Sequence, residues 1–197
     1  MLAKHIDIIM KKHIKGMKDN EINNLFDRIL EIFRLLQDKD EFENFYSSYL
    51  SKRLLAGASQ NDEAEKLFIS KLKKECGPHY PSKMETMMKD MKVSSELNED
   101  FKITAEHRRI PFTMNVHVLT TGKWPNDSIE DKCSIPYEIA PAMDIFTEFY
   151  MRKFHCLPTP GSDDSKCKRK LTWKMNFGQF DVTARFDKEY EIGMSGF

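Results

Sequence analysis

The chain has 197 residues, of which 40% are hydrophobic and 31% are charged; this composition supports one large or two small folded domains and excludes a disordered protein. Lysine plus arginine number 31 and aspartate plus glutamate also number 31, so the formal net charge is zero. Because general nucleic-acid binders usually have an excess of basic residues, this balance argues against nucleic acid as a partner.

No targeting or membrane segment is evident in the sequence. Charged side chains interrupt the residues after Met1 every few positions, unlike a signal peptide, and no apolar run is long enough to span a membrane. We therefore expect no membrane partner, and a location in the cytoplasm, the nucleus or both. In a reducing compartment the four cysteines, too few for a disulfide framework, are expected to be free thiols. They are Cys76, Cys133, Cys156 and Cys167.

The first half of the sequence has the three- and four-residue spacing of apolar side chains that is typical of amphipathic helices. Asp38, Asp62 and Ser82 are each followed by a glutamate three residues later, which is the spacing of a capping box at a helix start. Gly16 and Gly77 are suited to end helices. Together these signals predict five helices, over residues 2–15, 22–36, 38–54, 62–76 and 82–91.

The third predicted helix has an apolar face that is rich in aromatic side chains. Because no polar groups converge among them, we expect this face to form core between helices rather than a cofactor pocket, with Tyr46 and Leu50 buried. The members of the face are Phe42, Phe45, Tyr46, Tyr49, Leu50 and Leu54.

The period of the pattern changes to two in the second half of the chain. Apolar and polar residues alternate over residues 112–119, which is typical of a half-buried strand. Gly122 and Pro125 bound a turn that contains Trp124.

One more helix is predicted over residues 138–154, and a loop rich in proline, glycine, serine and aspartate follows it. The residues after Lys170 are expected to form two or three short strands, with a turn at Lys188 and Glu189. The apolar face of the helix consists of Met143, Phe146 and Tyr150.

These elements predict an α+β fold with two domains. Residues 1–105 are expected to form an antiparallel helical bundle, because each helix has one apolar face to bury. Residues 106–197 are expected to form a small α/β unit whose short antiparallel sheet is incomplete at the C-terminus.

The sequence offers little for catalysis. A zinc site usually requires two closely spaced ligand pairs, and only Cys76 with His79 has such a spacing, since His155, Cys156 and Cys167 are too scattered to form the second pair. No Gly-x-Ser-x-Gly turn and no glycine-rich phosphate loop is present. We therefore expect no metal, no cofactor and no catalytic residue; the alternative is an enzyme that uses the thiol of Cys133 or Cys156.

Lysines gather at two helix ends, and both groups have two interpretations. They either complement the negative end of the helix dipole or form a docking groove for an acidic partner segment. The first group is Lys11, Lys12 and Lys15, and the second is Lys71, Lys73 and Lys74.

Several blocks of the sequence together resemble the cullin family, and most of all its cullin-3 branch. "KDEFENFYSSYLSKRLL" (39–55) resembles the signature in which Phe-Tyr precedes Leu-x-x-Arg-Leu-Leu, and "NDEAEKLFISKLKKECG" (61–77) resembles the block that follows it. "SKMETMMKDM" (82–91), "VLTTGKWP" (118–125), "FTEFY" (146–150) and "KLTW" (170–173) come next in the family's order. The resemblance thus covers nearly the whole chain.

The resemblance implies a non-catalytic scaffold of a ubiquitin ligase. Cullins hold a RING-box protein, one strand of which joins the cullin sheet, and that protein recruits the ubiquitin-conjugating enzyme. A basic groove that attracts an acidic tail of the conjugating enzyme would correspond here to Lys11, Lys12 and Lys15. The residues expected to dock the RING-box strand are Phe112, Met114, Val116, Val118, Trp124 and Trp173.

The sequence also departs from the family. It has neither the helical stalk that holds a substrate adaptor, so no adaptor is expected, nor the winged-helix module with its modified lysine. Residues 155–169 are longer than the family's usual link and suggest an exposed insertion. A fragment, a short paralogue and an incomplete gene product are all consistent with this pattern, and a decoy that occupies the RING-box protein is the alternative function.

Overall fold

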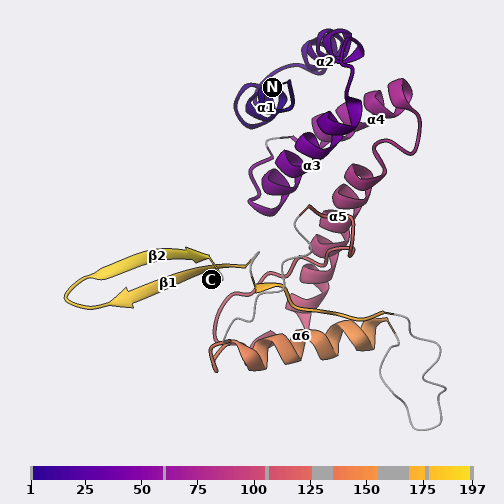
Figure 1. Ribbon diagram of the computed structural model, residues 1–197. Helices are drawn as coiled ribbons and strands as arrows, with labels where there is room; N and C mark the ends of the chain where they lie inside the picture. The colour runs from indigo at the N-terminus through magenta and orange to yellow at the C-terminus, as the bar shows by residue number, and fades with distance from the viewer. Residues whose placement is uncertain are drawn as a thin grey trace, which may run out of the picture. The chain divides into compact units, whose positions relative to one another are not determined.

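The computed structural model describes residues 2–59, 61–104, 107–125, 135–154, 169–175 and 178–195. The chain forms two compact units: Met1–Asn98 with Asn115–Asp127, and Glu99–Met114 with Ser128–Phe197. Its described parts contain helices and one two-stranded antiparallel sheet, so the predicted α+β class is confirmed (Figure 1). None of the described helices is both long and apolar enough to cross a membrane.

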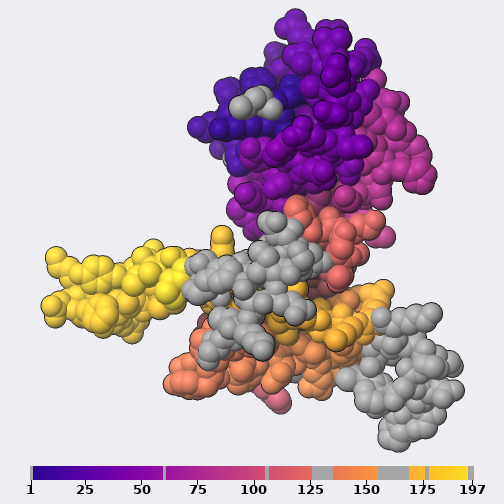
Figure 2. Space-filling view, viewed as in Figure 1, coloured from indigo at the N-terminus to yellow at the C-terminus, as the bar shows by residue number. Residues whose placement is uncertain are grey.

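Helices make up most of the first unit. The N-terminal helix has one π-helical turn at its end, and α1 packs against α3 (Figure 2, in indigo and purple). The elements are α1 (Leu2–Ile8), the π-helical turn η1 (Ile9–His13), α2 (Asp19–Arg34), α3 (Lys39–Leu55), α4 (Asp62–Cys76) and α5 (Ser82–Ile103), whose last residues belong to the second unit.

Two glycines end helical segments, as the sequence predicts. Gly16 and Gly77 both have φ of +86°, a left-handed conformation that other residues rarely adopt. The predicted start of α4 is wrong in its detail, because Asn61 is the capping residue and its side chain accepts hydrogen bonds from the N–H groups of Glu63 and Ala64. The capping-box pattern made Asp62 the capping residue and Glu65 its partner, but Glu65 is fully buried.

The aromatic face of α3 forms core, as expected. Tyr46 and Leu50 are fully buried, and the ring of Tyr46 lies 5.7 Å from that of Phe42 and 5.3 Å from that of Phe68 on α4. Phe45 is the exception, because its side chain is 52% exposed. Its place on the predicted face is therefore wrong: this position lies toward the solvent side of the helix.

The helix that the sequence predicts over residues 82–91 is much longer, since α5 continues to Ile103. The prediction stops early because the apolar methionine stripe gives way to polar residues at four-residue intervals. These residues, Asp90, Ser94 and Asn98, are nevertheless buried.

The second unit contains the short helix η2 (His107–Arg109), α6 (Ala140–Lys153) and the strands β1 (Gln179–Arg185) and β2 (Glu189–Ser195). The predicted apolar face of α6 is confirmed, since Met143, Phe146 and Tyr150 are buried. Residues 169–175 run along α6 (Figure 1), where the ring of Trp173 lies 5.9 Å from that of Phe146 and its indole N–H donates to Thr147 (3.2 Å).

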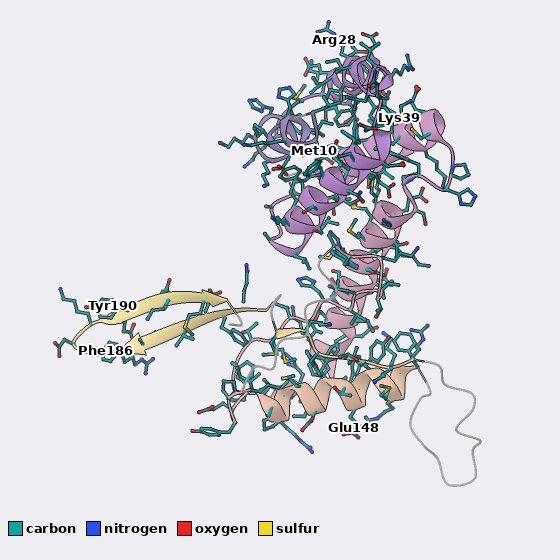
Figure 3. The ribbon with its side chains drawn as sticks, viewed as in Figure 1. Met10, Arg28, Lys39, Glu148, Phe186 and Tyr190 are labelled. Carbon is teal, nitrogen blue, oxygen red and sulfur yellow. The ribbon has the colours of Figure 1, made fainter. Side chains whose placement is uncertain are left out.

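The strands β1 and β2 pair in a hairpin, with the turn close to the predicted position. Phe186 and Tyr190 lie at the closed end of the hairpin (Figure 3), with ring centroids 6.3 Å apart. The strand predicted over residues 112–119 is wrong as a member of a sheet, because the one described sheet consists of β1 and β2 only. The backbone of that segment has other hydrogen-bond partners, which are described next.

Candidate strand-docking site

Side chains of α5 bind the backbone of residues 116–120, all within the first unit. The bonded residues on α5 recur every four positions, and those on the bound segment recur every two positions. We call Asp90, Ser94 and Asn98 the α5 ladder, and its three rungs join Asn98 to Val116, Ser94 to Val118 and Asp90 to Thr120.

The spacing of the α5 ladder matches that of an extended chain. Four residues of an α-helix rise by about 6 Å, and two residues of a strand rise by about 6.6 Å. A segment that runs antiparallel to α5 can therefore meet a new side chain at every second residue. In this way the helix supplies the hydrogen bonds that a neighbouring strand would supply in a sheet.

The rungs at Asn98 and Ser94 satisfy both polar groups of the backbone they face. The amide of Asn98 accepts from the N–H of Val116 (2.9 Å) and donates to its carbonyl (2.8 Å). The hydroxyl of Ser94 accepts from the N–H of Val118 (2.8 Å), and its single proton lies between the carbonyls of Asp90 (2.7 Å) and Val118 (3.3 Å). Such satisfaction offsets the cost of burying these polar groups.

The third rung also anchors an aromatic side chain. The carboxylate of Asp90 accepts from the N–H and the hydroxyl of Thr120 (2.7 and 2.8 Å) and from the indole N–H of Trp124 (2.9 Å). Trp124 is buried in the same core cluster as Tyr46 and Leu50. Asp90 thus ties the turn at Gly122 to the helical core.

The opposite edge of the bound segment carries backbone polar groups that no described residue binds. In an extended chain, the N–H and C=O groups of successive residues point to opposite edges, so those of Asn115, His117 and Leu119 lie on the edge away from the α5 ladder. None of these groups has a hydrogen bond to another residue that the structure describes. We call residues 115–119 the edge segment.

The hairpin of the second unit is another exposed β structure. Its register places apolar pairs on one face, and most of these side chains are exposed, among them Val182, Tyr190, Ile192 and Met194. A hairpin of two strands is marginally stable in water without a packed face. The pairs of this face are Phe180 with Met194, Val182 with Ile192 and Ala184 with Tyr190.

The structure places the six residues expected to dock a strand in both units. In the first unit, Val116 and Trp124 are buried and Val118 is half-buried. In the second unit, Phe112 is 36% exposed, Met114 is half-buried and Trp173 packs on α6. The α5 ladder was not predicted from the sequence, although small polar residues at four-residue spacing before a strand-like segment are a signal for it.

A buried charge cluster is the second feature that the sequence did not reveal. Arg53 is completely buried, and its guanidinium donates to both carboxylate oxygens of Glu65 (2.8 and 3.0 Å) and to Asp7 (2.6 Å). Tyr46 donates to Glu65 (3.1 Å). Burial, followed by the charge of Glu65, raises the pKa of the Tyr46 phenol well above its ordinary value. The cluster joins α1, α3 and α4, and its four side chains are all buried, which favours a structural role.

The basic group on the N-terminal helix is only partly available. Lys11 donates to Asp7 (3.0 Å), which is also bound to Arg53, whereas Lys12 and Lys15 are exposed and have no ion pair to another described residue. The helix end therefore presents two of the three expected lysines to solvent.

The thiol and metal expectations concern a region that is mostly undescribed. Cys133, His155, Cys156 and Cys167 lie outside the described residues. Burial raises the pKa of the Cys76 thiol, which is the opposite of what an activated nucleophile requires. In the described part of the chain, no three His, Cys, Asp or Glu side chains come together as a metal site.

Comparisons with known proteins agree on one family. The model of the cullin alpha solenoid domain matches residues 1–98, and that of the cullin alpha+beta domain matches residues 118–197. Cullin-3 of Dictyostelium discoideum is 37% identical to this chain over 195 residues, which are 98% of this chain and 24% of that protein.

Two further relatives give the same picture. Cullin-3A of Arabidopsis thaliana is 34% identical over 194 residues, covering 98% of this chain and 25% of that protein. Cullin-4A of Mus musculus is 33% identical over 199 residues, covering 98% of this chain and 24% of that protein. The chain thus spans about a quarter of the length of the curated relatives it matches.

Proposed function

The chain belongs to the cullin family, and we propose that it is part of the scaffold of a cullin-RING ubiquitin ligase, where it binds a RING-box protein by strand addition. In this role the chain supplies no catalytic residue. The ubiquitin-conjugating enzyme is an indirect partner, brought by the RING-box protein.

The open side of the edge segment is the observation that carries this proposal. Three residues present N–H and C=O groups along one line that no other described residue binds, and an added strand recognises such a line through main-chain hydrogen bonds. Because Asn115 and His117 are also exposed, a guest strand has access to this edge without displacing buried side chains.

Hydrogen exchange resolved by residue tests the proposal. In the free chain, the amides of Val116, Val118 and Thr120 should exchange slowly, because the α5 ladder holds them. Adding a RING-box protein should protect the amides of Asn115, His117 and Leu119, which the free chain leaves open. Failure of the two proteins to form a complex would contradict the scaffold role, and protection confined to residues 179–195 would assign docking to the hairpin instead.

The exposed lysines support a secondary part of the proposal. Lys12 and Lys15 would attract an acidic tail of the conjugating enzyme over a distance of about 10 Å at moderate salt. Replacing both with glutamate should lower the rate at which an acidic peptide associates with the chain, and the difference should shrink as salt is added. A rate that does not depend on these two lysines would contradict this assignment.

A further inference from the structure

The edge segment is held extended by helix side chains rather than by a neighbouring strand. We infer that Ser94 and Asn98 are positioning residues for strand docking: they hold the edge segment in the conformation that a guest strand needs. This inference rests on the proposed function, because it assigns a role to residues behind the same edge.

The α5 ladder favours one backbone conformation of the edge segment. A short segment without a partner samples many backbone conformations, and only the extended one aligns its outward N–H and C=O groups. The apparent dissociation constant of a guest equals the intrinsic constant divided by the fraction of the segment in the competent conformation. By bonding Val116 and Val118 on the inner edge, Asn98 and Ser94 keep this fraction high before the guest arrives.

The α5 ladder also fixes the register of the edge segment. A shift by one residue would turn Asn115 and His117 toward α5 and expose the polar groups of Val116 and Val118 on the outer edge. The two rungs oppose that shift, because Asn98 is matched to both the N–H and the carbonyl of Val116. The α5 ladder therefore determines which residues direct their N–H and C=O groups toward the guest strand, and it keeps their backbone extended.

Asp90 belongs to the α5 ladder but is a poor probe of this role. Its carboxylate also holds the indole of Trp124, which is part of the core. A change at Asp90 would therefore alter stability as well as docking. Among the described residues, Ser94 and Asn98 bond only the edge segment and their own helix, so their replacement leaves the anchor of Trp124 in place.

The test compares variants of the complete 197-residue chain with a RING-box protein as the probe. Ser94→Ala with Asn98→Leu removes both rungs while keeping residues that favour a helix. Ser95→Ala is the matched control, because Ser95 is the exposed neighbour of Ser94 on the same helix. Affinity is measured by calorimetry at a temperature where circular dichroism shows all variants to be folded, and Ser94→Ala alone serves if the double variant does not fold.

Positioning predicts a pattern that a merely structural role does not produce. The folded double variant should bind the RING-box protein at least tenfold more weakly than the parent chain, and the amides of Val116 and Val118 should exchange faster. Ser95→Ala should leave the affinity unchanged. An unchanged affinity of the folded variants, with the parent chain binding, would overturn the positioning role alone; a parent chain that does not bind would overturn the proposed function and this inference together.

Discussion

Arg53 is a single residue on which three helices depend. Its positive charge is compensated by Glu65 and Asp7. Removal of its side chain would leave both carboxylates buried, and of the cations that pair with them now, Lys11 alone would remain, beside Asp7. We expect Arg53→Ala to lower the free energy of unfolding by about 3–5 kcal/mol, which is typical when one partner of a buried ion pair is lost. Urea unfolding followed by circular dichroism measures the change.

An exposed ion pair provides the control for Arg53. Lys66 and Glu63 also form a salt bridge (2.7 Å), but both side chains are more than half exposed. Lys66→Ala should therefore lower the free energy of unfolding far less than Arg53→Ala does, because solvent already screens this pair. Equal effects of the two substitutions would show that Arg53 and its partners are not buried as described.

The titration of Glu75 tests its ion pair with Arg34 on the surface. Arg34 binds both carboxylate oxygens of Glu75, and these hydrogen bonds lower the pKa of the carboxyl from its ordinary value. The stabilisation is therefore present above the unfolded-state pKa and is lost as the pH falls through the folded-state pKa. In Arg34→Ala, an NMR titration should find the pKa of Glu75 raised toward its ordinary value.

Arg34→Lys separates charge from geometry at the same site. Lysine keeps the positive charge but lacks the planar fork that binds both oxygens. The pKa of Glu75 should therefore lie between the values in the parent chain and in Arg34→Ala. If Arg34→Ala leaves the pKa of Glu75 where it was, the ion pair does not persist in solution.

At the scale of elements, Gly193 lowers the stability of the hairpin, because glycine within a strand is unfavourable. This residue pairs with Asp181 in the middle of β2, its φ is not in the left-handed region, and a Cβ atom there would lie in ordinary contact, 3.6 Å from the Asp181 carboxylate. Gly193→Thr should stabilise the hairpin by up to about 1 kcal/mol. Amide exchange in β1 and β2 should then slow by up to about fivefold.

Gly178, which precedes β1, is the contrasting position. A Cβ atom there would lie 3.0 Å from the backbone carbonyl oxygen of Met175, which is closer than such contacts normally are. Gly178→Thr should therefore not slow exchange in the hairpin. Equal protection by both substitutions would mean that the Met175 carbonyl does not lie against Gly178 as described.

The elements also show what sequence patterns reveal and what they miss. Helices with one apolar face were predictable because burial imposes the period of 3.6, and α2, whose buried residues recur every three or four positions, is the clearest case. The end of α5 was not, because the residues of the α5 ladder are buried yet polar. The alternation over residues 112–119 does indicate an extended backbone, but periodicity cannot tell whether a strand or a helix supplies its hydrogen bonds. The sequence thus predicted the extended segment of the candidate site, but not the helix side chains that bind it.

For the whole molecule, the main difference from the sequence-based expectation concerns the division into units. The predicted boundary lies at residue 105, whereas the compact units divide within α5 and return residues 115–127 to the first unit. The reason is chemical: the α5 ladder and the buried indole of Trp124 attach this segment to the helices. A change in apolar period marks where the secondary structure changes, and it does not mark where the core ends.

Two truncated chains distinguish these divisions. A chain that ends at Asp127 keeps the α5 ladder with its bound segment, whereas a chain that ends at Thr104 loses Trp124 from the core and leaves Asp90, Ser94 and Asn98 without their partners. We expect the longer chain to be more stable toward urea by at least about 3 kcal/mol, the usual cost of deleting a large buried aromatic side chain. Trp124→Ala in the longer chain should reproduce much of the loss, because the substitution removes the same ring while the rest of residues 115–127 remains. If the two truncated chains are equally stable, the first unit ends near residue 105 and the edge segment is not part of it, which would also remove the support for strand docking there.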